Sequence, residues 1–287
     1  MKSFQHFILT RFNVRVDYSK SRTGINPDWL THRFKLFDQF CYPSVRSQSN
    51  QNFKWLVFFD SETPRRFQTK IQEYAQWQNF IPIYVDCEFT DEINRETVLH
   101  YLKTNVDYLI TTRLDNDDAV SQDFVQLIQS NFQQQEFEFL NFTSGYVWHN
   151  GKLYAFDYFH NPFMSLFEKI HEPTINGFKT IICGQHTELS ALGKIKQIKT
   201  KPTWLQVIHE KNVSNRIRGI RQPIKHLTDN FSIPTEYTAT QEQLLPYLLD
   251  KSFTLLKSPV ESLVLALPKN TRSNLRKAWT IMQSKNI

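Results

Sequence analysis

Three carboxylates lie within four residues of the sequence, directly after an apolar run. The run covers residues 108–114, and Asp115, Asn116, Asp117 and Asp118 follow it. Carboxylates packed this closely repel one another and are costly to remove from water unless a cation lies among them. The spacing therefore indicates a divalent-metal site on Asp115 and Asp117.

Asp118 also allows a purely structural interpretation. Asp and Ser are favoured residues at helix N-caps. Asp118 or Ser121 could therefore cap a helix that the sequence predicts at about residues 122–133. Both interpretations stay open from the sequence.

Mn²⁺ and Mg²⁺ are the cations that suit such a site. Mg²⁺ binds through one or two protein carboxylates and completes its octahedron with water and phosphate oxygens, and Mn²⁺ accepts the same kind of ligand. A metal held there can act as a Lewis acid for a departing diphosphate. Three cations further along the chain, Lys211, Arg216 and Arg218, could neutralise the charge that develops on it.

Alternating apolar runs and amphipathic segments precede the acidic cluster. They predict strands at residues 4–10, 53–59, 80–85 and 108–114, and helices within 29–48, from an N-cap at Thr63 to about residue 77, and at 95–103. This order predicts an α/β fold with a mostly parallel central sheet flanked by helices. Ligands bind such sheets outside the carboxyl ends of the strands. The polar positions there include residues 10–13, Asp60 and residues 115–118.

The pattern after residue 135 is looser. Strands are expected at residues 136–143, 145–154, 159–167 and 180–184, and a last one at 201–209. We divide the chain into a main domain at 1–232 and a helical, basic C-terminal extension at 233–287 with two or three short helices. Within the main domain, residues 1–118 form a Rossmann-like nucleotide-binding half, and residues 119–232 an acceptor-binding half with a closing loop.

Composition limits the classes of protein that fit. Only 7 glycines occur among 287 residues, and no Gly-rich phosphate loop is present. Three cysteines without C-x-x-C spacing predict neither a zinc site nor a disulfide framework, which favours the cytoplasm. No apolar stretch is long enough to span a membrane, and the N-terminal run is too short for a signal peptide.

Positive charge is concentrated in the last third of the chain. Residues 194–287 carry 16 Lys and Arg against 6 Asp and Glu, whereas residues 1–193 carry 18 against 22. This asymmetry indicates an anionic partner such as a diphosphate, an acidic glycan or a phospholipid surface. No nucleic-acid motif accompanies it, so nucleic acid is not expected. Residues 267–287, with five basic and no acidic residues, could contact a membrane surface peripherally or form a solvated helical face.

Four motifs in the same order resemble the rhamnosyltransferase family of bacterial glycosyltransferases. They are residues 9–13, 55–60, 111–118, and 206–209 with 212–216, and the resemblance covers roughly residues 4–220. It implies a GT-A glycosyltransferase fold in which an Asp-x-Asp motif ends a central strand. In that fold the motif holds a nucleotide sugar through a divalent cation. Rhamnose is the sugar that the family's name indicates.

The resemblance also implies roles for individual residues. Asp117 would be the direct metal ligand, and Asp115 would face the ribose or support the metal. His209 would complete the metal shell, unless it is a strand-end histidine bonded to backbone. Asp60 would read the base. The loop of Thr10, Arg11, Phe12 and Asn13 would contact the nucleotide, and Arg113 would touch the diphosphate or pair with Asp115.

A general base is needed to deprotonate the acceptor hydroxyl if the enzyme inverts the anomeric centre. Glu188 is the leading candidate, because it follows a predicted strand and opens a predicted helix. Asp157 and His186 are rivals, and Glu188 could instead be only a partner of the helix dipole. A retaining mechanism would need no such base.

These features predict a metal-dependent glycosyltransferase. It would move a sugar from a nucleoside-diphosphate donor to a hydroxyl of a surface glycan or lipid-linked acceptor. A metal-dependent nucleotidyl or phosphoryl transferase would use the same carboxylates. A carbohydrate- or nucleotide-binding protein without turnover is the third alternative.

Overall fold

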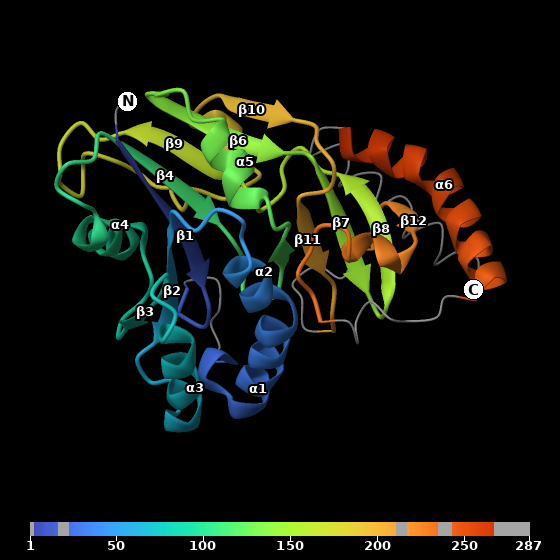
Figure 1. Cartoon of the computed structure of the whole chain (residues 1–287), viewed down its shortest axis with the longest axis horizontal. Helices are drawn as coiled ribbons and strands as arrows, with labels where there is room; N and C mark the ends of the chain where they lie inside the picture. Colours follow the sequence, from blue (N-terminus) through green and yellow to red (C-terminus); the bar gives the residue numbers. More distant parts are fainter. Residues whose placement is uncertain (1–2, 17–22, 211–216, 235–242, 267–287) are drawn as a thin grey trace, which may run out of the picture.

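A seven-stranded sheet forms the larger part of the molecule (Figure 1). The computed structural model describes residues 3–16, 23–210, 217–234 and 243–266. The strand order is β10-β6-β9-β4-β1-β2-β3. The strands are β1 (Phe4–Arg11), β2 (Lys54–Asp60), β3 (Phe80–Val85), β4 (Tyr108–Arg113), β6 (Phe137–Phe142), β9 (Ser165–Lys169) and β10 (Ile195–Ile198).

The α/β class is confirmed, and the sheet is mixed. β1 runs parallel to β2 and β4, β2 runs parallel to β3, and β10 runs parallel to β6. β9 is antiparallel to both of its neighbours, β4 and β6. The four strands that the sequence predicts before residue 115 therefore form one continuous parallel block, β4-β1-β2-β3, and their carboxyl ends lie at the same edge.

Helices cover both faces of this sheet. They are α1 (Pro27–Leu36), a π-helical stretch η2 (Phe37–Cys41), α2 (Tyr42–Arg46), α3 (Arg65–Ala75), α4 (Asp91–Tyr101) and α5 (Phe124–Ser130). Side chains of β2 alternate between two cores, as a strand buried on both faces requires. Trp55 and Val57 pack with α1 and α3, whereas Leu56 and Phe58 pack on the side of α4.

The helix starts differ from those that the sequence predicts. Pro64 is the N-cap of α3, and the hydroxyl of Thr63 instead donates to the carbonyl of Asp60 at 2.6 Å. α4 begins at Asp91, four residues early, because the side chain of Thr90 caps it. The N-cap of α5 is Asp123, so neither Asp118 nor Ser121 caps that helix.

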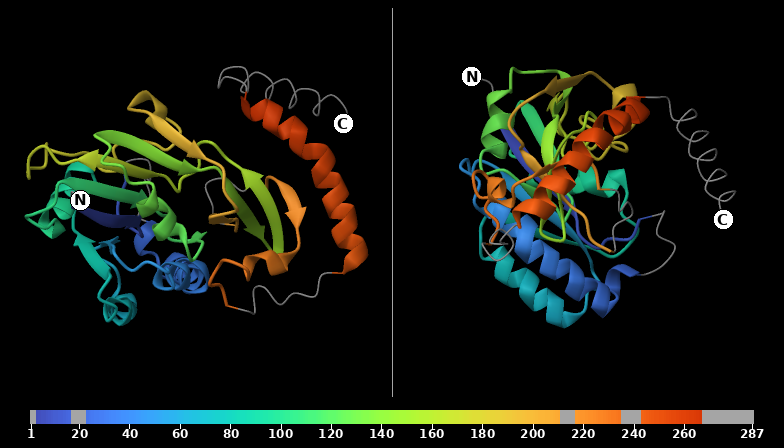
Figure 2. Two further views of the ribbon diagram at one scale, coloured as in Figure 1. Left: turned by 45° about the horizontal axis from the view of Figure 1, so that its top comes forward. Right: turned by 90° about the vertical axis from the view of Figure 1, so that its right-hand side faces the viewer.

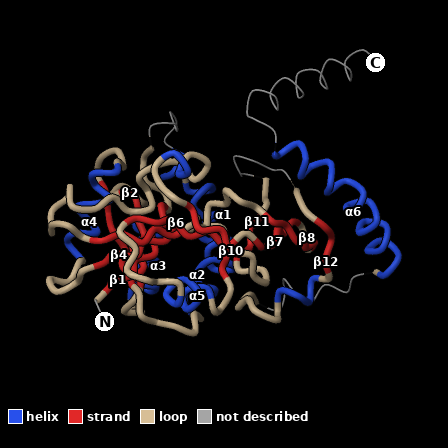
Figure 3. The backbone as a smooth tube through the Cα atoms, turned by 90° about the horizontal axis from the view of Figure 1, so that it is seen from above, coloured by secondary structure: helices blue, strands red, loops and turns tan. Residues whose placement is uncertain are grey.

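A second, five-stranded sheet lies beside the first, and the sequence did not predict it as a separate sheet. Its order is β12-β8-β7-β11-β5. The strands are β5 (Ala119–Val120), β7 (Ser144–His149), β8 (Lys152–Asp157), β11 (Trp204–Val207) and β12 (Ile220–Gln222). Seen from above, the strands of both sheets occupy the middle of the molecule with helices around them (Figure 3).

Three strand predictions are wrong in this half. Residues 145–154 form the hairpin of β7 and β8 rather than one strand, because Asn150 and Gly151 adopt positive φ angles of 46° and 75°. The strand predicted at 159–167 begins only at Ser165, and residues 180–184 form no strand. The strand at 201–209 is β11, and β12 follows it, so it is not the last.

Packing between β7 and β11 depends on a glycine. A Cβ atom on Gly145 would lie 2.0 Å from the indole ring of Trp204. Trp204 is almost completely buried and stacks on Phe163 with ring centroids 5.2 Å apart. The absence of a side chain at Gly145 therefore lets Trp204 fill the core where the two sheets meet.

One long helix, α6 (Leu244–Ala266), forms the described part of the predicted C-terminal extension, and it runs along β12 (Figure 2). The rest of the region for which two or three short helices are predicted, residues 235–242 and 267–287, lies outside the described residues. Within the described ranges, no helix combines the length and apolarity that crossing a bilayer requires. Strands from both sides of residue 118 belong to the seven-stranded sheet. The boundary drawn from the sequence between residues 1–118 and 119–232 therefore does not coincide with the division between the two sheets.

Candidate active site

The acidic loop, residues 115–118, connects the two sheets. It begins where β4 of the first sheet ends and leads directly into β5 of the second. Asn116, Asp117 and Asp118 are each at most 6% exposed. Burial of carboxylates at this density requires hydrogen-bond donors or cations around them, and the structure supplies both.

Asp117 is held by two cationic or polar side chains from distant elements. Its Oδ2 accepts hydrogen bonds from Arg33 Nη1 on α1 and from His209 Nε2, the latter at 2.9 Å. His32, next to Arg33 on α1, contacts the other ring nitrogen of His209 at 3.2 Å. Burial raises the pKa of Asp117, but the hydrogen bond from His209 and the charge of Arg33 outweigh it, so the pKa lies below its usual value.

Asp118 and Asn116 fix the loop to its surroundings. Asp118 Oδ1 accepts from the backbone N–H of Val207 on β11 at 2.8 Å. Asn116 donates to the carbonyl of Phe12 at 2.6 Å and accepts from Arg33 at 3.1 Å. Burial raises the pKa of Asp118 well above its usual value, and the charges of the neighbouring carboxylates add to this shift. Asp118 therefore joins the loop to the second sheet and is not a helix cap.

Asp115 lies at the open side of the loop. Its side chain is 38% exposed and pairs with Arg113 at 3.2 Å. Of the two roles expected for Arg113, the structure shows the pairing with Asp115. Asp115 and Asp117 therefore have different neighbours: one faces an arginine at the strand end, and the other faces α1 and His209.

His186, which the sequence singled out, lies within reach of the charge of Asp115. His186 is half-buried, and its Nδ1 contacts the carbonyl of His160. Burial lowers the pKa of His186, and the charges of Arg113 and Asp115 act on it in opposite directions. The ring of Tyr158 lies 6.4 Å from that of His186, and the guanidinium of Arg218 lies 5.6 Å from the ring of Tyr158.

The other candidate bases, Glu188 and Asp157, lie at the N-cap of a short turn and at the end of a strand. Glu188 is exposed at the N-cap of a short 3₁₀ turn, Leu189–Ala191. The helix predicted to open at Glu188 is therefore only this turn. Asp157, at the end of β8, forms an ion pair with Lys199 at 2.9 Å.

The end of β1 and the loop that follows it contain both buried and partly exposed residues. Thr10 is fully buried and accepts from the indole N–H of Trp55 at 2.9 Å, and Phe12 packs among aromatic rings of the core. The half-buried Arg11 follows Thr10. The side chains of Thr10 and Phe12 therefore hold this loop in place from inside the protein.

Asn13 and Asp60 lie together, as the sheet topology predicts. Asn13 Oδ1 accepts from the backbone N–H of Asp60 at 3.2 Å. The carboxylate of Asp60 accepts from Arg15 at 2.8 Å and from the N–H of Glu62 at 2.8 Å. Lys211 and Arg216 lie outside the described residues.

The sequence profile of a family described as "Putative rhamnosyl transferase" matches residues 9–221. The chain belongs to this family. The match includes the end of β1, the acidic loop, His209 and Arg218, and it confirms the resemblance and the expected class of enzyme, a glycosyltransferase. No curated protein matches the chain.

Solved structures that align with this family member share little sequence with it. Residues 1–349 of TarS from S. aureus are 10% identical, with 72% of this chain and 60% of that chain covered and a TM-score of 0.41. The same TarS fragment in complex with UDP is 10% identical, with 96% and 78% covered and a TM-score of 0.41. HddC from Yersinia pseudotuberculosis is 12% identical, with 70% and 93% covered and a TM-score of 0.38. The chain thus spans less than two thirds of the first of these structures.

The residues around Asp117 fit a divalent cation in part. Among the described residues, no three His, Cys, Asp or Glu side chains are grouped as a complete metal site. Asp117 Oδ2 and His209 Nε2, however, are 2.9 Å apart. A metal that bound both atoms would replace the hydrogen bond between them, because Nε2 must give up its proton to become a ligand. Asp115 pairs with Arg113 instead.

Sequence reasoning missed Arg33, His32 and Arg15. The segment 29–48 was assessed only for its apolar positions, which predict a helix but say nothing about its polar side. Arg33 and His32 lie on that side, and both are far in sequence from the acidic loop. A buried carboxylate needs a cation beside it, but no signal in the sequence shows which Lys or Arg residue is that cation.

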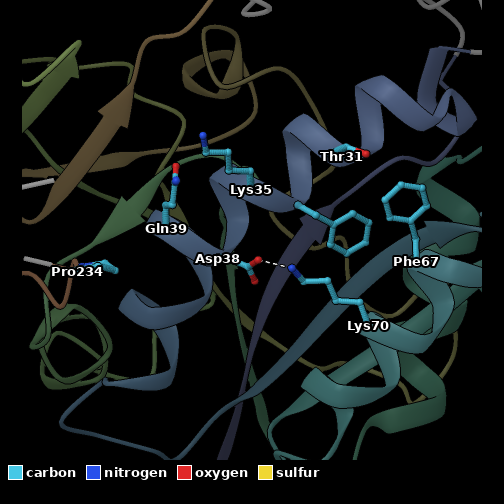
Figure 4. Close-up of a pocket in the computed structure, with 8 residues that line it drawn as sticks. Thr31, Lys35, Asp38, Gln39, Phe67, Lys70 and Pro234 are labelled. Atoms are coloured by element: carbon cyan, nitrogen blue, oxygen red, sulfur yellow. Dashed lines mark hydrogen bonds and ion pairs between the residues drawn. The ribbon is translucent and has the colours of Figure 1, made fainter. Parts of the chain in front are cut away.

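A hollow of about 430 Å³ lies elsewhere, between α1, η2 and α3 (Figure 4). Its lining includes Lys35, Asp38 and Lys70. Asp38 is already bound by Lys70 and by the hydroxyl of Tyr74. Because none of the acidic-loop residues lines it, this hollow is separate from the candidate active site.

Proposed function

We propose that this protein is a metal-dependent glycosyltransferase of the GT-A type. In this proposal it moves a sugar, rhamnose by the family's description, from a nucleoside-diphosphate donor to a hydroxyl of a surface glycan or lipid-linked acceptor. The observation that carries the metal role is the contact of His209 with Asp117, a buried carboxylate that follows a central parallel strand. Buried charge arranged in this way is typical of functional sites.

Asp117 and His209 would hold Mn²⁺ or Mg²⁺, and Asp115, the most exposed carboxylate of the loop, could add a further ligand. The metal would stabilise the charge of the departing diphosphate. Arg33 and Arg218 support this role, because each has a buried Nε atom without a hydrogen-bond partner among the described residues. A phosphate oxygen would satisfy such a donor. Asn13 and Asp60 would contact the nucleoside.

Analysis of the products of a panel of nucleotide sugars tests the function. With Mn²⁺ and an acceptor extract, we expect release of a nucleoside diphosphate and loss of that release in EDTA. Release of a nucleoside monophosphate or pyrophosphate would instead identify a nucleotidyl or phosphoryl transferase. Donor binding without any product, measured by calorimetry, would indicate a binding protein.

The general base that we propose for an inverting reaction is His186, one of the two rivals of Glu188. A carbonyl oxygen only accepts hydrogen bonds, so the contact with His160 places the imidazole proton on Nδ1 and leaves Nε2 to accept a proton. Burial lowers the pKa of His186, which keeps the ring neutral at pH 7. A neutral imidazole near Asp115 is therefore available for the acceptor hydroxyl.

Replacing His186 by glutamine is expected to lower kcat by about 10² to 10⁴ and to leave donor affinity nearly unchanged. Since the lowered pKa lies below 6.5, kcat/KM of the native protein should fall only as the pH drops through that lowered pKa, when the ring becomes protonated. His186→Gln should lack this acid limb. The exposed His171 provides the matched control, His171→Gln. A variant at His186 that keeps both its rate and its acid limb would exclude this base.

A further inference from the structure

The outer side of α6 carries large apolar side chains that are exposed in the described structure. Leu245, Leu249, Phe253 and Leu256 are between 63% and 80% exposed. Monomeric proteins rarely leave apolar side chains of this size side by side on one surface. We call these four residues the outer face of α6.

The side of α6 that faces the protein is polar. Asp250 accepts from Lys152 on β8 at 2.6 Å, and the hydroxyl of Thr254 accepts from the backbone N–H of Arg221 on β12 at 3.0 Å. The guanidinium of Arg221 lies 5.6 Å from the ring of Tyr247. A surface helix ordinarily turns its apolar side to the core and its polar side to water. In residues 244–257, the part of α6 whose side chains the structure describes, this arrangement is reversed.

A helix whose apolar side points outward needs an apolar surface outside the protein to cover that side. The positive charge on and after α6 indicates which kind of surface this is. Lys257 is exposed on α6, and residues 267–287 carry five basic and no acidic residues in the sequence. A second copy of the chain packed there in the same orientation would bring a second residue 267–287 segment of the same positive charge beside the first, and this segment has no acidic residue that could pair with its counterpart. An anionic bilayer offers both hydrocarbon and negative charge.

We propose that α6 docks this protein on an anionic membrane surface, with its outer face in the boundary between headgroups and acyl chains. The sequence alone indicated a contact through residues 267–287, whereas the structure assigns the apolar part of the contact to α6. Docking there would hold the second sheet beside the membrane, because Lys152 and Arg221 fasten α6 to β8 and β12. The inference does not depend on the metal or the donor.

Flotation of the full chain with vesicles tests the docking. We expect the native protein to bind vesicles that contain phosphatidylglycerol and to bind pure phosphatidylcholine vesicles much less. The triple variant Leu245→Gln, Leu249→Gln, Leu256→Gln should lower binding about a hundredfold, because three apolar side chains no longer leave water. Glutamine keeps helix propensity, and all three positions are exposed, so the fold should be retained.

Leu192→Gln is the matched control, since Leu192 is an exposed leucine away from α6. Circular dichroism and the thermal midpoint show whether each variant is folded. Equal vesicle binding by the triple variant and the native protein would overturn the proposal. Absence of vesicle binding, together with a concentration-dependent dimer that the triple variant loses, would overturn it in favour of a second copy of the chain. Neither outcome would bear on donor turnover.

Discussion

Replacing Asp117 by asparagine should lower sugar transfer by about 10³-fold or more. Asparagine keeps the shape of the side chain but removes the charge that Arg33 and His209 contact. A metal contributes several kcal/mol of transition-state stabilisation, and about 4 kcal/mol corresponds to a factor of 10³ in rate. Turnover is measured as nucleoside-diphosphate release in a titration with Mn²⁺.

Asp123→Asn is the control for this substitution. Asp123 is also an aspartate near β5, but it lies outside the acidic loop, at the N-cap position of α5, and its side chain pairs with Lys201. It should keep its Mn²⁺ dependence. If Asp117→Asn retained nearly native turnover with the same dependence on Mn²⁺, Asp117 would have no role as a metal ligand.

Replacing Arg33 by glutamine should have the second largest effect, and it should act in opposite directions on two quantities. Without metal, the loss of a charged hydrogen bond to a buried carboxylate should lower the free energy of unfolding by about 2 kcal/mol. With Mn²⁺, the rise in the thermal midpoint should be larger than in the native protein. The metal then meets a carboxylate whose charge Arg33 no longer neutralises.

Arg46→Gln is the matched control on the neighbouring helix. The guanidinium of Arg46 lies over the rings of Tyr42 and Trp77 and has no contact with the acidic loop in the described structure. Its shift with Mn²⁺ should equal that of the native protein. A shift in Arg33→Gln that is equal to or smaller than the native one would show that Arg33 and the metal do not share Asp117.

The first four strands could be predicted to within one residue because several independent signals agree there. The predicted strand at residues 80–85 is β3, and the one at 108–114 is β4 with one extra residue. In both, a dense apolar run is bounded by polar residues. The hairpin of β7 and β8 was missed although Asn150 and Gly151 form a strong turn signal between apolar runs. That dipeptide was included in a strand instead.

The residues of the candidate active site could be predicted only in part. The sequence identifies Asp115, Asp117 and Asp60 because they lie at or after the ends of parallel strands, whose carboxyl ends meet at one edge. His209 is indicated only by the resemblance to the family, and its strand β11 belongs to the second sheet. Arg33 lies on a helix, and only the packing of α1 brings it to Asp117. The side-chain contacts of Thr10 and Phe12 likewise depend on which way the chain turns after β1. Residue type and spacing do not determine such directions.

The bond between Asp118 and the N–H of Val207 has a consequence for ligand binding. It joins the acidic loop to the strand that leads to His209, and Asn116 joins the same loop to the chain after β1. A loop that is bonded to both sheets has few alternative conformations. The entropy cost of ordering it is therefore met during folding, before any ligand binds. A ligand that binds there then loses less entropy on association, and more of its contact energy appears as affinity.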